Sequence, residues 1–302
     1  MSDYVLSCCS TADLPAEHLE KRQIVWLPFH FTLDGVAYRD DLGQTVPYSV
    51  FYEKLKQGAE VSTSQVSVGE YEDHFAALMK EGHDVLHVCF SSGLSGSYRS
   101  ACIAAENVRE QFPSRRLIVL DSMAASSGYG MLMDSLADLR DEGISLDDAA
   151  AWVEENKFRI NHWFFSTDLS AYIRGGRISK TAGLFGGLLE ICPLLDMDGD
   201  GRLAPRAKVR TKKRVMAALV DKMELLAENG RSYAGKCYLC HSSCREDAEA
   251  VAALIRARFP NVTDVVLCDV GTTVGCHTGS GTVAVFFFGE SRRAAAEAEE
   301  TA

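Results

Sequence analysis

A serine- and glycine-rich turn is the segment of this chain whose residue types point most directly to chemistry. Residues 84–90 form an apolar run typical of a buried strand, and the turn SSGLSGS follows at residues 91–97 before a helical pattern begins. Hydroxyls and backbone N–H groups between a strand and a helix N-terminus converge on an anion. In an open α/β sheet such a turn lies at the carboxyl edge, where ligands bind. The sequence therefore predicts an anion or polar-ligand site near Ser95. The alternative is a tight turn whose serines only cap the helix.

Two other polar segments could face this turn. Residues 61–65, VSTSQ, precede a capped helix, and Thr63 or Ser64 could serve only as a cap. Residues 271–282 contain four glycines around His277 and are expected to form a loop. Glycines let a backbone approach a ligand closely, and a histidine there can titrate or donate, although a lone histidine is often structural.

These segments leave two chemistries open. Ser95 and His277 could act as a nucleophile and its base in an esterase or acyl-transfer enzyme, with the turn N–H groups as an oxyanion hole. Against this, Ser95 lies in no Gly-x-Ser-x-Gly motif, and the sequence offers no identifiable acidic partner. In the simpler alternative, hydroxyls and a histidine hold an anion without reacting with it.

Two further motifs point to cofactors but fit poorly. Residues 237–241, CYLCH, match the attachment motif of c-type haem, yet they lie in a strand-like run without an export signal. A strand leading into a helix capped by Ser243 and Glu246 explains them better. Residues 196–201 open like a calcium loop, but Ala207 occupies the position of the bidentate glutamate. We therefore expect no metal and no cofactor.

Composition limits the class of protein. The 302 residues are 47% hydrophobic and 24% charged, which is typical of a soluble protein with more than one core. A net charge of -11 argues against nucleic acid or anionic lipid surfaces as partners. Without a signal segment or a membrane-spanning run, a cytoplasmic protein with free thiols is expected.

One cluster of basic residues stands out in this acidic chain. It is either a functional surface or an ordinary solvated one, and it consists of Arg206, Lys208, Arg210, Lys212, Lys213 and Arg214.

Hydrophobic periodicity predicts an α/β protein in two parts. Short apolar runs alternate with amphipathic patterns in the first half, which is typical of a mainly parallel sheet flanked by helices. The expected strands are 4–9, 24–33, 84–90 and 116–121, and the helices are 47–57, 67–81, 97–111 and 125–142. Ser67 with Glu70 makes a capping box, and Ser145 with Asp148 resembles one.

The second half predicts an α+β domain with antiparallel pairing. A strand at 162–168 precedes a glycine-rich segment that includes residues 184–189. A hairpin then follows, with strands at 190–197 and 202–209. Helices are expected at 211–229 and 244–258, and further strands at 235–241, 262–269 and 282–288. We place the domains at 1–163 and 164–290, followed by a tail at 291–302 that has little to bury.

Seven ordered motifs resemble those of the DegV family. They lie at residues 10–15, 63–65, 90–98, 168–170, 174–179, 208–213 and 275–282, and the resemblance covers about residues 4–289. Three positions depart from the family pattern: Val66 replaces a proline, Cys192 stands where a lysine is common, and Cys9 alters the first motif.

The resemblance implies two α/β domains with one long-chain fatty acid between them. It implies a bacterial lipid-binding protein, not an enzyme, that presents the acid to a fatty acid kinase subunit for acyl phosphate formation and phospholipid synthesis. Thr63, Ser95, Gly96 and His277 are similar to the carboxylate-binding residues. Arg174, Arg177 and Arg210 are similar to residues implicated in the phosphate or kinase contact.

Overall fold

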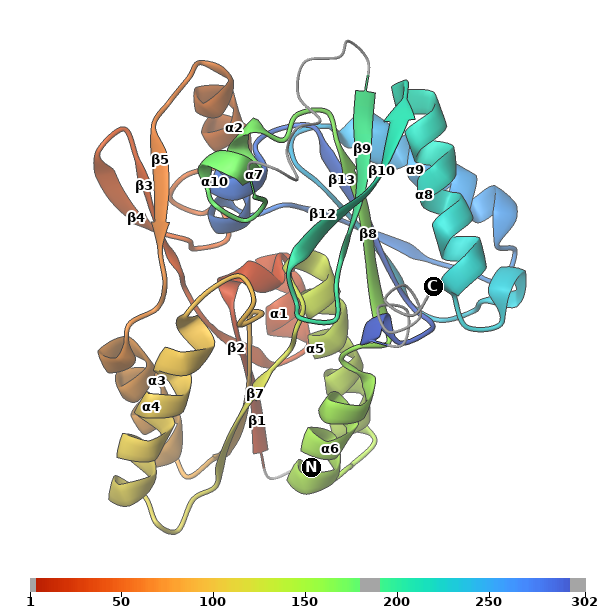
Figure 1. The fold of residues 1–302 in the computed structure, drawn as a ribbon. Coiled ribbons are helices and arrows are strands. Elements are labelled where there is room, and N and C mark those ends of the chain that lie inside the picture. Colours follow the sequence, from red (N-terminus) through yellow and green to blue (C-terminus); the bar gives the residue numbers. More distant parts are fainter. Residues whose placement is uncertain (1–3, 180–190, 294–302) are drawn as a thin grey trace.

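The first half of the chain builds a four-stranded parallel sheet (Figure 1), as the sequence predicts. In the computed structural model, which describes residues 4–179 and 191–293, its strand order is β2-β1-β6-β7. The strands are β1 (Tyr4–Cys9), β2 (Ile24–Leu27), β6 (Asp84–Cys89) and β7 (Leu117–Asp121). A short 3-10 helix, η1 (Ser10–Ala12), follows β1. The α-helices that accompany the strands are α1 (Ala16–Lys21), α3 (Val68–Lys80), α4 (Ser97–Gln111), α5 (Ser126–Asp141) and α6 (Leu146–Asn156).

Two helix starts agree with their predicted capping signals, and a third does not. The Ser67 side chain accepts a hydrogen bond from the Glu70 N–H, and Glu70 accepts from the Ser67 N–H, so the predicted capping box is confirmed. Ser145 likewise caps α6 through the Asp148 N–H. The cap predicted at Ser243 is wrong. Ser243 adopts a left-handed φ of 53°, and the helix begins two residues later after Cys244, whose thiol donates to the Thr282 carbonyl.

A small antiparallel sheet interrupts the predicted βαβ order. Its order is β4-β3-β5, and its strands are β3 (His30–Leu33), β4 (Val36–Arg39) and β5 (Val61–Ser64), with α2 (Tyr48–Lys56) between the last two. The single strand expected at 24–33 is wrong, because this run contributes to two different sheets. Pro28 lies at the break, where its missing N–H and fixed φ end the first strand.

The second half forms a six-stranded sheet of order β10-β9-β8-β13-β11-β12. Its pairs are antiparallel except β11 with β12. The strands are β8 (Ile160–Ser166), β9 (Ile191–Met197), β10 (Leu203–Arg210), β11 (Cys237–His241), β12 (Val265–Asp269) and β13 (Thr282–Phe288). The helices are α7 (Ser170–Arg174), α8 (Lys212–Leu226), α9 (Arg245–Arg258) and α10 (Thr272–Thr278), with the short η2 (Gly230–Ser232). The expectation of a loop over 271–282 is therefore wrong for residues 272–278.

Helix α5 joins the two large sheets. Its residues are almost all buried, and it contacts β1 of the parallel sheet and β8, β11 and β13 of the second sheet. One hydrophobic core consequently contains residues of both halves. The predicted domain limit at residue 163 falls inside β8, and the division into two domains stays a prediction. The glycine-rich segment at 184–189 and most of the tail at 291–302 lie outside the described residues.

Candidate ligand-binding site

A cavity of about 480 Å³ lies between elements of the two halves, within the size range of small-molecule sites. The small sheet, the serine turn, α5, β8, β13 and α10 all contribute to it. Its lining residues are Phe29, Thr63, Ser64, Gln65, Phe90, Ser92, Leu94, Ser95, Gly96, Ala125, Ser126, His162, Phe164, Tyr172, Arg177, Met197, Leu203, Cys240, Val270, Thr273, Val274, His277, Thr278, Thr282, Ala284 and Phe286.

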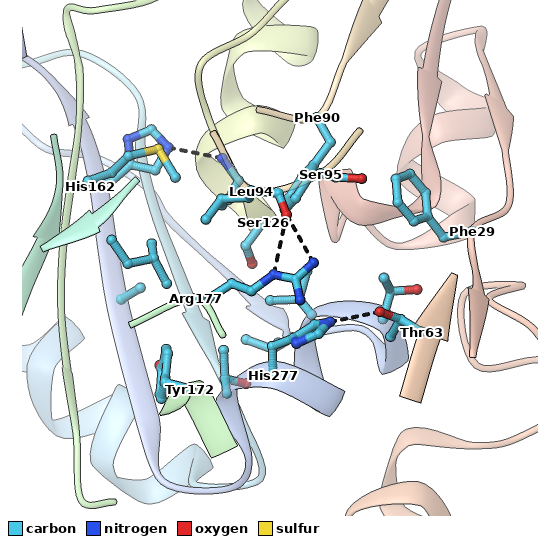
Figure 2. A pocket seen from close by; sticks show the side chains of 18 of the residues that line it. Phe29, Thr63, Phe90, Leu94, Ser95, Ser126, His162, Tyr172, Arg177 and His277 are labelled. Atoms are coloured by element: carbon cyan, nitrogen blue, oxygen red, sulfur yellow. Dashed lines mark hydrogen bonds between the residues drawn. The ribbon is translucent and has the colours of Figure 1, made fainter. Parts of the chain in front are cut away.

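Thr63 and His277 meet at one end of this cavity, although 214 residues separate them. Strand β5 holds Thr63 opposite Phe31 of β3, and α10 carries His277. The Thr63 Oγ1 and His277 Nε2 atoms are 2.8 Å apart (Figure 2). Burial, reinforced by Arg177 and Arg174, lowers the pKa of His277 to about 4, so its ring is neutral at pH 7.

The surroundings of the His277 ring differ at its two nitrogens. Its Nδ1 atom is buried without a hydrogen-bond partner among the described residues, and a Cβ on Gly175 would lie 2.3 Å from it. We expect the proton on Nε2, which then donates to Thr63 Oγ1. The Thr63 hydroxyl keeps its own proton and can donate to a ligand in the cavity.

The serine turn lies between β6 and α4, and Gly96 is the residue just before the helix. The Ser95 Oγ accepts from the Ser97 N–H at 3.2 Å, which leaves the Ser95 O–H as a donor. A Cβ on Gly96 would overlap the Gln65 side-chain oxygen, so a larger residue there would displace the Gln65 side chain. Gln65 in turn donates to Ser100 of α4 at 2.9 Å. This contact holds the end of β5 against the turn.

Arg177 lines the cavity and connects the second half of the chain to the turn. Its Nε and Nη2 atoms donate to the Leu94 carbonyl at 3.2 and 3.0 Å (Figure 2), and its Nη1 donates to the Gly175 carbonyl at 2.6 Å. Arg174, at the end of α7, and Arg210, at the end of β10, are exposed and do not line the cavity. Of the three predicted arginines, only Arg177 therefore reaches the cavity.

Apolar side chains from β8 and β13 cover another part of the wall. Phe164 pairs with Ala284, and His162 with Phe286, so alternate residues of both strands face the cavity. Figure 2 shows His162 on the side of the pocket opposite Thr63 and Phe29. Sequence reasoning missed His162 and Tyr172 as lining residues. The one available signal was the alternation of β8, which does not reveal its partner strand.

No nucleophile–base pair forms between Ser95 and His277. His277 Nε2 bonds Thr63, Ser95 bonds the backbone of its own turn, and no carboxylate among the described residues bonds the ring Nδ1. A catalytic triad requires a nucleophile hydrogen-bonded to a base, and that base hydrogen-bonded to a carboxylate. The arrangement in residues 4–179 and 191–293 suits binding of an anion better than nucleophilic attack.

The described residues contain neither a metal-binding cluster nor a membrane-spanning helix. In residues 4–179 and 191–293, no three His, Cys, Asp or Glu side chains gather to hold a metal ion. Cys237 and Cys240 of the haem-like motif lie buried in β11, and all ten cysteines are free thiols. None of the helices described is both long and apolar enough to span a membrane.

A model for uncharacterised proteins of the DegV family matches residues 9–290. The chain belongs to the DegV family. A DegV domain-containing protein of Clostridium perfringens is 36% identical over 292 residues, covering 97% of this chain and 99% of the relative. One from Lactococcus lactis is 34% identical over 284 residues, covering 94% and 97%.

Solved DegV structures confirm the fold class. A fatty-acid-binding DegV protein from Thermus thermophilus has a TM-score of 0.84 at 25% identity, covering 95% of this chain and all of that chain. A DegV lipid-binding protein from Thermotoga maritima has a TM-score of 0.83 at 24% identity, covering 97% and all of that chain. A Ruminococcus gnavus family member refined with vaccenic acid gives 0.83 at 19%, covering 95% and 100%.

Proposed function

We propose that this DegV protein binds one long-chain fatty acid in the 480 Å³ cavity, with the carboxylate at the Thr63 end. The observation that carries this proposal is the cavity itself, which has hydroxyl donors at one end and an apolar wall from β8 and β13. Fatty-acid binding by the Thermus thermophilus relative supports the same ligand class. From here on, the cavity is called the acyl cavity.

Burial of the acyl tail supplies most of the binding free energy. About fifteen methylenes at roughly 0.8 kcal/mol each contribute on the order of 10 kcal/mol before the cost of ordering the chain. A buried carboxylate without partners would cancel several kcal/mol of this gain. The head group therefore needs donors, and the site offers hydroxyl and backbone donors at its polar end.

The carboxylate donors are the hydroxyls of Thr63 and Ser95, together with the backbone N–H of Gly96. Each hydroxyl already accepts a hydrogen bond, Thr63 from His277 and Ser95 from the Ser97 N–H, so each proton can point to the ligand. The N-terminus of α4 adds a partial positive charge beside the same turn. His277 acts here by orienting Thr63.

The proposed carrier presents its acid to a fatty acid kinase subunit in the cytoplasm and then holds the acyl phosphate for phospholipid synthesis. Arg174 and Arg210 are exposed and could meet the kinase or a phosphate, while Arg177 is held by two backbone carbonyls. Within the basic cluster, Arg206 pairs with Asp196 and Lys212 with Asp247. The kinase contact is therefore assigned first to Arg174 and Arg210.

Native mass spectrometry of the purified protein separates this function from the esterase alternative. We expect one unmodified fatty acid per chain and no turnover of aryl esters. An empty protein that hydrolyses such esters with loss of activity in Ser95→Ala would establish the alternative.

A reconstituted kinase assay tests the second half of the proposal. Arg174→Ala should lower acyl phosphate formation at least about tenfold while fatty-acid affinity stays within about twofold, because Arg174 does not line the cavity. Arg231→Ala is the matched control, since Arg231 is exposed on η2 and pairs with Glu224. Normal phosphorylation by the Arg174 variant would reject this role.

A further inference from the structure

The serine turn is held in place by distant parts of the chain. Ser91 Oγ and the Leu94 carbonyl hydrogen-bond to residues of the second half. Ser97, the first residue of α4, is held from the first half, because its Oγ lies 2.7 Å from the hydroxyl of Tyr71 in α3. The N–H of Ser97 also donates to the Ser95 Oγ at 3.2 Å. The position of Ser97 therefore fixes one hydrogen bond of a proposed carboxylate donor.

Tyr71 is itself fixed on several sides. The capping box sets the start of α3, and the Tyr71 N–H donates to the Ser67 carbonyl at 3.2 Å. Its side chain is 0% exposed, with ring centroids 5.5 Å from stacked Phe75 and 5.4 Å from edge-on His87. The Cys9 Sγ atom lies 3.3 Å from the Tyr71 hydroxyl. The hydroxyl that meets Ser97 is consequently held in one place.

Helices α3 and α4 also connect the two hydroxyl donors of the site. They lie side by side (Figure 1), and each follows one donor, since β5 with Thr63 precedes α3 and the turn with Ser95 precedes α4. Near the start of these helices, Gln65 donates to Ser100 at 2.9 Å, and Tyr71 makes its contact one turn earlier on α4. The spacing of the two donor hydroxyls thus depends on how these helices are joined.

Neither Tyr71 nor Ser97 lines the acyl cavity, and both are 0% exposed. Any influence on the ligand must therefore pass through the Ser97 N–H to Ser95. The first N–H groups of a helix have no partner within the helix, and a serine hydroxyl nearby competes for them. Without the Tyr71 hydroxyl, the Ser97 side chain is free to turn toward these groups and to disturb the start of α4.

We propose that Tyr71 is a positioning residue for the fatty-acid carboxylate, a role that rests on the proposed function. Its hydroxyl holds Ser97, the Ser97 N–H holds the Ser95 Oγ, and the Ser95 proton is thereby directed into the acyl cavity. Tyr71 itself makes no contact with the acid.

A double-mutant cycle tests this role. Tyr71→Phe removes one oxygen and keeps the ring, and it should weaken fatty-acid binding about fivefold, less than Ser95→Ala because the Ser95 hydroxyl is still present. Ser97→Ala should cause a similar loss. In the Ser95→Ala background, neither change should weaken binding by more than about 1.5-fold, because the group that they position is gone. Fluorescent fatty-acid displacement measures all five variants.

A spectroscopic readout follows the head group itself. Palmitate labelled with carbon-13 at its carboxyl is bound to each variant, and the chemical shift of the carboxyl carbon reports its hydrogen bonds. Tyr71→Phe should move this resonance in the same direction as Ser95→Ala, and by a smaller amount. A loss of stability alone would leave the resonance in place.

Tyr233→Phe is the matched control. Tyr233 is also a buried tyrosine whose hydroxyl has two partners, since it donates to the Lys236 carbonyl at 2.6 Å and accepts from the Phe288 N–H at 2.9 Å. None of these three residues lines the acyl cavity. Its loss should lower the free energy of unfolding and leave both the affinity and the carboxyl resonance unchanged.

Two outcomes would overturn the proposal. One is a Tyr71→Phe protein whose affinity and carboxyl resonance match those of the unchanged protein. The other is a Tyr71→Phe loss that is equally large with and without the Ser95 hydroxyl, which would indicate a structural role alone. If the unchanged protein binds no fatty acid, the proposed function itself fails, which is a different result.

Discussion

Two histidines line the same cavity and are held in contrasting ways. His277 contacts a side chain, the Thr63 hydroxyl, and leaves its other nitrogen without a partner among the described residues. Among the described residues, His162 hydrogen-bonds only to backbone groups, at Ile160 and Ala125, and uses both nitrogens. Burial lowers the pKa of both, so both rings are neutral at pH 7. Under the proposed function, His277 orients a ligand donor, whereas His162 holds α5 against the cavity wall through the Ala125 N–H.

The largest expected effect concerns the donors that His277 helps to orient. Thr63→Val and Ser95→Ala should each weaken fatty-acid binding about tenfold, and the double variant about 100-fold or more, because a hydrogen bond to a charged group contributes roughly 1.5–3 kcal/mol. Fluorescent fatty-acid displacement measures these affinities. Ser92→Ala is the control, since Ser92 lies in the same turn and, among the described residues, its hydroxyl hydrogen-bonds only to the Met123 sulfur. An equal loss in Ser92→Ala would contradict the assignment.

Removing each ring separates the two roles. His277→Ala should lower affinity about tenfold with little change in the free energy of unfolding, because Thr63 loses its orienting donor. His162→Ala should lower the free energy of unfolding by about 2–4 kcal/mol, because it leaves a cavity and an unpaired Ala125 N–H. Urea unfolding and ligand titration of both variants provide the test. Equal effects on both quantities would remove the distinction.

The pH dependence of the free energy of unfolding tests the same comparison of the two histidines. A histidine with a lowered pKa stays neutral in the folded state, while in the unfolded chain it binds a proton below about pH 6.5. Its stabilising contribution is therefore present above pH 6.5 and is lost as the pH falls. The pKa of His162 lies well below its usual value and that of His277 is about 4. The urea midpoint of the unliganded protein should fall between pH 7.5 and 5.

Variants of each ring isolate this effect. His162→Gln and His277→Gln should each flatten the pH dependence between pH 7.5 and 5, because each removes a ring that stays neutral in the folded state and binds a proton in the unfolded chain. The raised pKa values of Asp13 and Asp40 act in the opposite direction, but they are common to all three proteins and cancel in the difference. An unchanged pH dependence in both variants would refute this prediction.

The smallest expected signal is the tautomer of each ring. Nitrogen-15 chemical shifts should identify His162 as protonated on Nδ1, which donates to the Ile160 carbonyl, and His277 as protonated on Nε2. The two rings would then give opposite patterns in one spectrum at pH 7. A proton on His277 Nδ1 would mean that Thr63 donates to the ring and is not available to the carboxylate.

Local pattern predicts much of this fold because most elements carry their own signals. The capping box at Ser67 and the hairpin turn after Met197 are both confirmed. The strand at 24–33 failed because a continuous apolar run does not reveal that its two ends pair with different sheets. Helix α10 was missed because its glycines and threonines have low helix propensity, and tertiary contacts hold it instead.

The candidate site is also only partly visible in the sequence. Residues Thr63, Ser95, Gly96 and His277 were identified, and the structure brings all four to one cavity. Their pairing could not be predicted, because the contact of Thr63 with His277 depends on β5 and α10 meeting across 214 residues. His162 and Met197 carry no spacing signal, since only the register of β8 and β9 brings them together.

A crystal structure of the protein with palmitate tests the central claim most directly. The account predicts one extended acid in the acyl cavity, with its carboxylate within hydrogen-bond distance of Thr63 Oγ1 and Ser95 Oγ. The methyl end should lie beside His162 and Met197. A carboxylate at the His162 end, or an acid bound outside this cavity, would contradict the account.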